Sequence, residues 1–105
     1  MDQKVASLLS LCVKAGMLRT GEETVEKLLR NESAQLVIIA GDAADNTKRK
    51  FTNKCFYYKK PIRIFAERGD LSRCVGEQNR TVYCITDAGF AARILEQIDT
   101  QSESS

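Results

Sequence analysis

The sequence contains no histidine, the side chain that most often serves as a general base or a metal ligand near neutral pH. It also lacks the phosphate-binding loops Gly-x-x-x-x-Gly-Lys and Gly-x-Gly-x-x-Gly, and it has no serine in a nucleophile-elbow pattern. Carboxylates are present, but no pair stands out, so a carboxylate or cysteine enzyme is the least favoured class. We therefore expect a protein that is not an enzyme and that needs no cofactor or metal.

Long apolar segments are also missing. No segment approaches the roughly 20 apolar residues of a membrane-spanning helix, and residues 1–4 lack the apolar stretch of a signal peptide. The four cysteines form no Cys-x-x-Cys motif, and each lies within an apolar pattern, as a small buried side chain would: Cys12, Cys55, Cys74 and Cys84. We expect reduced thiols, a cytoplasmic location and no membrane partner.

The net charge is only +2, but the basic residues are unevenly distributed. Residues 46–66 contain no acid and seven basic side chains, namely Lys48, Arg49, Lys50, Lys54, Lys59, Lys60 and Arg63. A one-sided basic stretch attracts polyanions, although a solvated helix face explains the same pattern equally well. The stretch alone therefore does not decide between a binding surface and an ordinary exposed helix.

The spacing of apolar residues predicts helices that alternate with short strands, in a chain whose 105 residues suit a single domain. Helices are expected near 3–15, 21–30, 45–58, 71–75 and 87–98, and extended segments near 17–19, 36–40, 62–65 and 81–85. The apolar run 36–40 is typical of a strand covered on both faces. The pattern predicts an α/β sheet with helices on both sides, as one domain over 1–99 with a disordered polar tail over 100–105.

Polar residues at the expected helix starts indicate specific caps. Thr20 and Glu23 have the spacing of a capping box, in which the threonine caps the helix and the glutamate bonds back to its amide. Asp42 or Asp45 could cap the helix near 45–58, and Asp87 the last helix.

Several stretches, in their order and spacing, resemble the kink-turn-binding ribosomal-protein family that includes large-subunit proteins seven-Ae and thirty-e, and in particular its bacterial YlxQ branch. They span about residues 4–98 and read Lys14-Ala15-Gly16, Arg19-Thr20-Gly21-Glu22-Glu23, Ala34-Gln35-Leu36-Val37-Ile38-Ile39-Ala40, Asp42-Ala43-Ala44-Asp45-Asn46-Thr47-Lys48, Lys54-Cys55-Phe56-Tyr57-Tyr58 and Gly76 to Asp87. Any one of these motifs is weakly specific, whereas the ordered set is strongly specific.

The resemblance implies a three-layer α/β/α sandwich around a mixed four-stranded sheet with one very short strand. It also implies a monomer that binds structured RNA, such as a kink-turn in ribosomal RNA or a messenger leader, with the ribosome as a candidate partner. In the family, the glycine-led start of the second helix contacts the RNA backbone and sheared G·A pairs, and a later loop covers an extruded base. Carried over to matching positions, the RNA-binding residues are Gly21, Glu22, Glu23, Thr24, Lys27, Lys48, Arg68, Gln78, Asn79 and Arg80.

The residues at the second helix start fit this function, but they also have structural explanations. Gly21 would let an RNA backbone approach without a side chain in between, and a helix start offers unpaired amides to an anion. Gly21 could equally serve only to begin the helix, and Glu22 and Glu23 could be favourable charges in its first turn.

The acidic residues Glu22 and Glu23 also suggest an alternative to RNA binding. Glu22, Glu23 and Thr24 occupy places where stronger binders of the family carry a small residue, an asparagine or lysine, and an acid or amide. Two acids beside phosphates lower affinity, so the alternative is a protein-interaction module that has lost RNA binding. Outside this site, we expect Tyr57 and Tyr58 to pack, although their rings could also stack on bases. The same interpretation leaves residues 59–60 outside the RNA surface.

Overall fold

The computed structural model describes residues 2–77 and 79–103. In chain order these residues form α1 (Gln3–Lys14), β1 (Leu18–Thr20), α2 (Glu22–Arg30), β2 (Leu36–Ile39), α3 (Asp45–Tyr58), β3 (Ile62–Ile64), α4 (Arg68–Val75), β4 (Val82–Ile85) and α5 (Ala88–Glu103). Every helix and strand that the sequence predicts is present, and the bounds of α3 are the predicted ones. No helix in the described part of the chain combines the length and apolar character that crossing a membrane would need.

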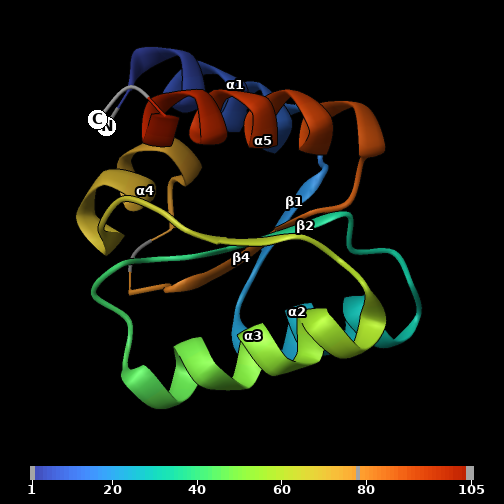
Figure 1. Ribbon diagram of the computed structural model, residues 1–105. Helices are drawn as coiled ribbons and strands as arrows, with labels where there is room; N and C mark the ends of the chain where they lie inside the picture. The colour runs from blue at the N-terminus through green and yellow to red at the C-terminus, as the bar shows by residue number, and fades with distance from the viewer. Residues whose placement is uncertain (1, 78, 104–105) are drawn as a thin grey trace.

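The strands form one mixed sheet in the order β1-β4-β2-β3. Strand β4 is antiparallel to both β1 and β2, whereas β2 and β3 are parallel. Helices α2 and α3 cover one face of the sheet, and α1, α4 and α5 cover the other (Figure 1). The predicted three-layer α/β/α sandwich with a mixed four-stranded sheet is therefore confirmed; the two outer strands, β1 and β3, have three residues each.

Alternating side chains of the central strands build two apolar cores. In β2, Leu36 and Ile38 belong to the cluster under α1, α4 and α5, whereas Val37 and Ile39 belong to the cluster under α2 and α3. All four side chains are fully buried, because both faces of this strand are covered by helices. No polar or charged residue is buried among residues 2–77 and 79–100, so both cores are formed by apolar packing.

The structure confirms the predicted cap of the last helix. Asp87 accepts a hydrogen bond from the amide of Phe90 at 2.8 Å, as expected of the residue before α5. Gly16 follows α1 with φ of 72°, a conformation that residues with a Cβ rarely adopt.

The predicted capping box at α2 is wrong. Thr20 is the last residue of β1 and pairs with Tyr83 of β4, so the sheet has taken the threonine that the local pattern assigned to the helix. Its hydroxyl donates to the carboxylate of Glu77 at 2.5 Å, and Gly21 occupies the N-cap position without any side-chain cap. The helix therefore begins with amides that no side chain caps.

The predicted aspartate cap of α3 is also wrong. Ala44 occupies the N-cap position and no side chain caps the helix, while Asp45 lies in its first turn. Asp42 is engaged elsewhere, because its carboxylate accepts a hydrogen bond from the backbone amide of Arg68 at 2.9 Å. A contact between residues far apart in the chain thus replaces the local cap.

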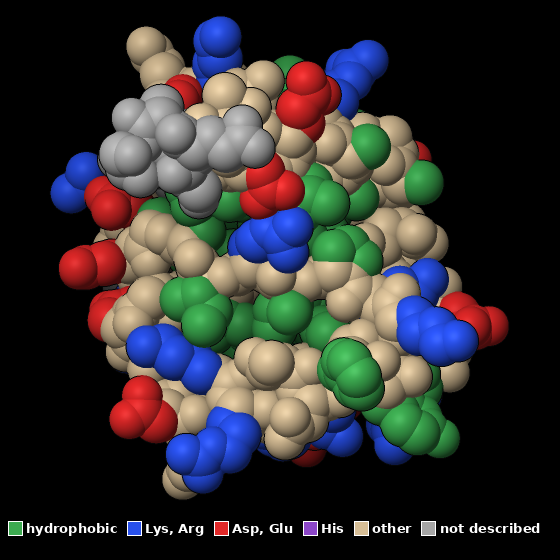
Figure 2. Space-filling view, viewed as in Figure 1, with side chains coloured by type: hydrophobic (Ala, Val, Ile, Leu, Met, Phe, Trp, Pro, Cys, Tyr) green, Lys and Arg blue, Asp and Glu red, His purple; other side chains and the backbone are tan. Residues whose placement is uncertain are grey.

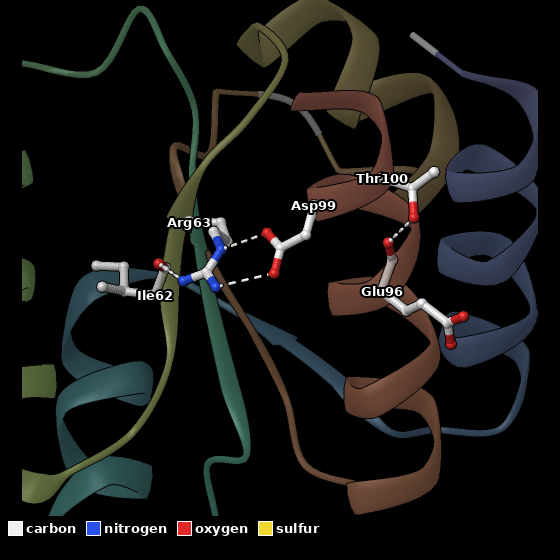
Figure 3. A network of polar contacts seen from close by, with 5 residues as sticks. All are labelled: Ile62, Arg63, Glu96, Asp99 and Thr100. Atoms are coloured by element: carbon white, nitrogen blue, oxygen red, sulfur yellow. Dashed lines mark hydrogen bonds and ion pairs between the residues drawn. The ribbon is translucent and has the colours of Figure 1, made fainter. Parts of the chain in front are cut away.

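Helix α5 extends farther than the sequence pattern indicated. It continues to Glu103, and the hydroxyl of Thr100 donates to the carbonyl of Glu96 at 2.8 Å, one helical turn earlier (Figure 3). Helix α5 thus includes residues 100–103, which the sequence pattern placed in the polar tail. Residues 104–105 lie outside the described residues.

An ion pair between the sheet and α5 covers part of the open edge of β3. The guanidinium of Arg63 donates to both carboxylate oxygens of Asp99, at 2.8 and 3.1 Å, and also to the carbonyl of Ile62 at 2.8 Å (Figure 3). Arg63 thereby satisfies a backbone acceptor on an edge strand, where unpaired backbone groups otherwise invite pairing with another chain.

Candidate nucleic-acid interface

Segments from across the sequence meet at one end of the sheet. Because β4 is antiparallel to β1 and β2, and β3 is parallel to β2, three strands end where β4 begins: Ile39 lies opposite both Val82 and Ile64, and Thr20 lies opposite Tyr83. The loop after β2 and the connection into β4 lie on the left of Figure 1, below α4. We call this end the candidate surface; it comprises Gly21–Thr24, Asp42–Lys48, Arg68–Arg73 and Gly76–Arg80 apart from position 78.

Gly21 links β1 to α2 in a conformation that favours glycine strongly. Its φ is 98° and its ψ 143°, and its amide donates to the carbonyl of Val82 at 3.0 Å. A Cβ at this position would lie 3.2 Å from the Nη1 atom of Arg80. The glycine thus permits both the turn and the close approach of the arginine, so the start of α2 and the loop before β4 form one continuous surface.

An ion pair and two hydrogen bonds position the loop before β4 and its Arg80 side chain. Glu77 accepts from Thr20 at 2.5 Å and pairs with Arg80 across 3.5 Å between Oε2 and Nε. The hydroxyl of Tyr83, whose ring is buried, donates to the backbone carbonyl of Arg80 at 2.6 Å. These contacts attach the loop before β4 to the sheet, which orients Arg80 toward Gly21.

A second pair orients Arg68. Its backbone amide donates to Asp42, and its Nε lies 3.4 Å from Oδ2 of the same carboxylate. The backbone hydrogen bond and the guanidinium together lower the pKa of Asp42 below its usual value. The arginine at the start of α4 is therefore tied to the loop that follows β2.

The two acids at the start of α2 differ in their surroundings. Oε1 of Glu22 lies 3.6 Å from Nζ of Lys50 on α3, and the same lysine lies 2.7 Å from Glu26, which lowers the pKa of Glu26 and raises that of Lys50. Glu23 is exposed and has no ion pair with any residue that the structure describes. Only Glu23 therefore presents an uncompensated carboxylate at this helix start.

Two hollows open on the candidate surface. The larger has a volume of about 470 Å³ and is lined by Arg68, Gly69, Ser72, Arg73, Gly76 and Asn79. The smaller, of about 80 Å³, is lined by Gly21, Glu22, Asn79, Arg80, Thr81 and Val82. Asn79 lines both, with a positive φ of 61° that asparagine tolerates better than most residues.

The structure brings most of the predicted site residues together. The exposed first turn of α2 contains Glu22, Glu23 and Thr24, and Lys48 lies half-buried in the first turn of α3. Lys27 is exposed in the last turn of α2, about 7.5 Å along the axis from the helix start, and lines neither hollow. Gln78 lies outside the described residues.

Sequence reasoning missed Ser72 and Arg73, which line the larger hollow. The spacing of Arg68 and Ser72, four residues apart, would have placed them on one face of a helix. That signal was weak because the short helix α4 was expected to begin only near Leu71, whereas it begins at Arg68.

The cysteine side chains are poorly suited to nucleophilic chemistry. Cys12, Cys55 and Cys84 are buried, as predicted, and Cys74 is half-buried. Burial raises the pKa of Cys12 and Cys55 to about 11 and that of Cys84 to about 12, so these thiols are protonated at neutral pH and poorly nucleophilic. Within residues 2–77 and 79–100, no cluster of three His, Cys, Asp or Glu side chains is arranged to hold a metal ion.

The sheet order and the charged surface at one end of the sheet define the chain as a small α/β-sandwich protein. Its sequence then shows the family to which it belongs. Residues 3–96 match the Ribosomal protein L7Ae/L30e/S12e/Gadd45 family, and the chain belongs to this family. The family resemblance inferred from the ordered motifs is thus confirmed.

Two curated relatives carry the name RNA-binding protein YlxQ. The protein of Bacillus subtilis strain 168 is 40% identical over 92 residues, which cover 88% of this chain and 92% of the relative. That of Enterococcus faecium is 38% identical over 97 residues, which cover 92% of this chain and 93% of the relative.

Solved structures agree with this placement. A protein of unknown function from Bacillus halodurans superposes with a TM-score of 0.90 at 39% identity, covering 93% of this chain and 99% of the other. The 15.5kD RNA binding protein of Giardia lamblia superposes with a TM-score of 0.77 at 20% identity, covering 92% of this chain and 86% of the other, which shows that the fold is shared.

Proposed function

We propose that this protein binds structured RNA through the candidate surface and recognises a kink-turn, or a similar internal loop with G·A pairs, by its shape and without catalysis. The observation that carries the proposal is the meeting of Gly21, the uncapped start of α2 and the arginines Arg68 and Arg80 at one end of the sheet. Family membership and the printed names of the two bacterial relatives support it.

The start of α2 is suited to a phosphate. The first amides of a helix have no intrahelical acceptor and carry the positive end of its dipole, so they attract anions. Gly21 adds no side chain that would keep a phosphate away from these amides. Lys27 follows one and a half turns later, where its flexible side chain can reach a phosphate of the same backbone.

Glu23 is the acid best placed to contact a base. A carboxylate can accept hydrogen bonds from both the N1–H and the N2–H of a guanine that is not in a Watson–Crick pair. Glu22 is already paired with Lys50, which both orients it toward α3 and reduces its repulsion of phosphate. We therefore assign guanine recognition to Glu23 rather than to Glu22.

The larger hollow suits an extruded nucleotide. This hollow has a volume of about 470 Å³ and lies beside the loop before β4. Arg68, Ser72 and Arg73 would offer a nucleotide bound there hydrogen-bond donors and positive charge. RNA readers usually recognise bulges and irregular loops, because the grooves of A-form duplexes conceal the base edges. A kinked loop that displays one unstacked base fits these features.

The expected partner is a structured RNA of the cytoplasm, such as ribosomal RNA or a messenger leader carrying this motif, bound by a monomer. Ribosome association belongs to this proposal. Family membership and the printed names of the bacterial relatives support an RNA partner.

The test is a calorimetric or gel-shift titration with a short kink-turn RNA, beside a control RNA whose G·A pairs are replaced by Watson–Crick pairs. We expect tight binding to the first alone, and log K should fall steeply with log salt because phosphate contacts release counterions. Equal weak binding to both RNAs, or a salt slope near zero, would contradict the proposal. A nuclease-resistant complex with a protein would then favour an interaction module on the same fold.

A further inference from the structure

Two adjacent aromatic side chains at the end of α3 are exposed. Phe56 is 87% and Tyr57 77% exposed, although we expected Tyr57 to pack in the core. Only Tyr58 packs, against the cluster under α2 and α3, because the helical rotation of about 100° per residue turns its two predecessors away from the sheet. The prediction of packing is therefore right for Tyr58 and wrong for Tyr57.

These rings belong to a stripe along the exposed face of α3. Arg49 lies two turns before Phe56 on the same side of the helix, and Thr52 and Asn53 lie between them, all of them exposed. We call Arg49, Thr52, Asn53, Phe56 and Tyr57 the α3 stripe. Figure 2 shows hydrophobic side chains protruding over the right-hand, C-terminal end of α3, with Lys and Arg side chains nearby.

The ring of Tyr57 has a defined orientation. It packs edge-to-face on Tyr58, with ring centroids 4.9 Å apart and planes at 90°. Because the half-buried Tyr58 packs against the core, Tyr57 is positioned without being covered. An exposed aromatic ring that is already oriented loses little conformational entropy when a flat partner stacks on it.

The charges around the stripe favour a polyanion over a protein. Of the seven basic residues in 46–66, Lys50 and Lys54 pair with α2 and Arg63 pairs with Asp99. Four have no ion pair with the described residues, namely Lys48, Arg49, Lys59 and Lys60. Two of these lie at each end of α3, and protein interfaces are depleted in lysine, whereas surfaces for single-stranded nucleic acid combine cations with exposed aromatic rings.

From this arrangement we propose that the α3 stripe is a second RNA-binding site, which takes unpaired nucleotides by stacking bases on Phe56 and Tyr57 while Arg49, Lys59 and Lys60 contact the phosphates. The inference goes beyond the proposed function, because it concerns single-stranded RNA and a face outside the candidate surface. Helix α3 starts at the candidate surface and its 14 residues extend about 21 Å, so a strand that leaves that surface along α3 reaches the rings.

The experiment is an anisotropy titration of a labelled oligouridylate of roughly eight nucleotides, a common site size for single-strand binders. The double variant Phe56→Ala/Tyr57→Ala should bind it roughly tenfold more weakly or worse, because stacking on two bases is lost. Leu11→Ala is the matched control, since Leu11 is a 52% exposed apolar residue on α1 whose loss should leave binding unchanged. Lys59→Gln/Lys60→Gln should weaken binding and reduce its salt dependence.

A parallel titration with the kink-turn duplex separates the two proposals. The aromatic double variant should bind this duplex as the wild type does, and oligouridylate should not displace it. The inference is overturned if the wild type does not bind oligouridylate at low salt, or if the aromatic double variant binds it unchanged; a protein would then be the better occupant. Oligouridylate binding without kink-turn binding would instead reject the proposed function and leave this inference standing.

Discussion

The interior of the sandwich and the candidate surface are built from opposite kinds of side chain. No polar or charged residue is buried among those that the structure describes, whereas the candidate surface is formed largely by charged groups in half-exposed pairs such as Asp42–Arg68 and Glu77–Arg80. Exposed pairs contribute little to stability, and apolar burial contributes most of it. Stability and the proposed RNA binding should therefore depend on different residues, and substitutions should separate them.

The largest expected effect is on stability, from the interior. Ile38→Ala should lower the free energy of unfolding by about 3 kcal/mol, because a fully buried side chain of the central strand is replaced by a cavity. Urea denaturation measures this change. Leu11→Ala, at an exposed apolar position, should cost far less, and a similar loss for both variants would contradict the distinction between interior and surface.

The next effect separates two glycines that both have positive φ. Gly21→Ala and Gly16→Ala should each lower stability by about 1–2 kcal/mol through backbone strain. Only Gly21→Ala should weaken kink-turn binding, by about tenfold or more (~1.4 kcal/mol), because only there would a Cβ meet Arg80 beside the uncapped helix start. If both variants bound RNA equally well, Gly21 would be structural and the candidate surface would lose its central residue.

A smaller effect compares the two acids of α2. Glu23→Gln should weaken kink-turn binding several-fold if the free carboxylate accepts guanine N–H donors, because the amide offers only one acceptor oxygen. Glu22→Gln should change affinity less, since Lys50 already compensates that carboxylate. Tighter binding by Glu23→Gln, measured by the same calorimetric titration, would show that Glu23 only repels phosphate.

The smallest effect is on the pH dependence of stability. Arg68 lowers the folded-state pKa of Asp42, so the pair stabilises the protein above the unfolded-state pKa, near 3.8, and this contribution is lost as the pH falls through the lower folded-state value. Asp42→Asn should therefore melt slightly below the wild type at pH 7, and the two melting temperatures should converge in acid. A difference that persisted unchanged at low pH would exclude the ion pair as its cause.

The candidate site was predictable in outline from the sequence. Ordered motifs identified the family, and with it the glycine-led helix start, Arg68 and the loop before β4. The geometry that assembles them was not visible locally, because Gly21 approaches Arg80 only after β1 pairs with β4. The pairing of Glu22 with Lys50, which distinguishes Glu22 from Glu23, likewise joins two helices that the local pattern treats separately.

The sequence by itself determined the order of helices and strands, the doubly covered β2 and the bounds of α3. These depend on the spacing of apolar residues along the chain, which involves neighbouring residues only. Only the tertiary structure decided that Thr20 belongs to the sheet and that Asp42 pairs with Arg68. Each of these outcomes is a competition between a local contact and a distant one, and the distant partner exists only once the layers have packed.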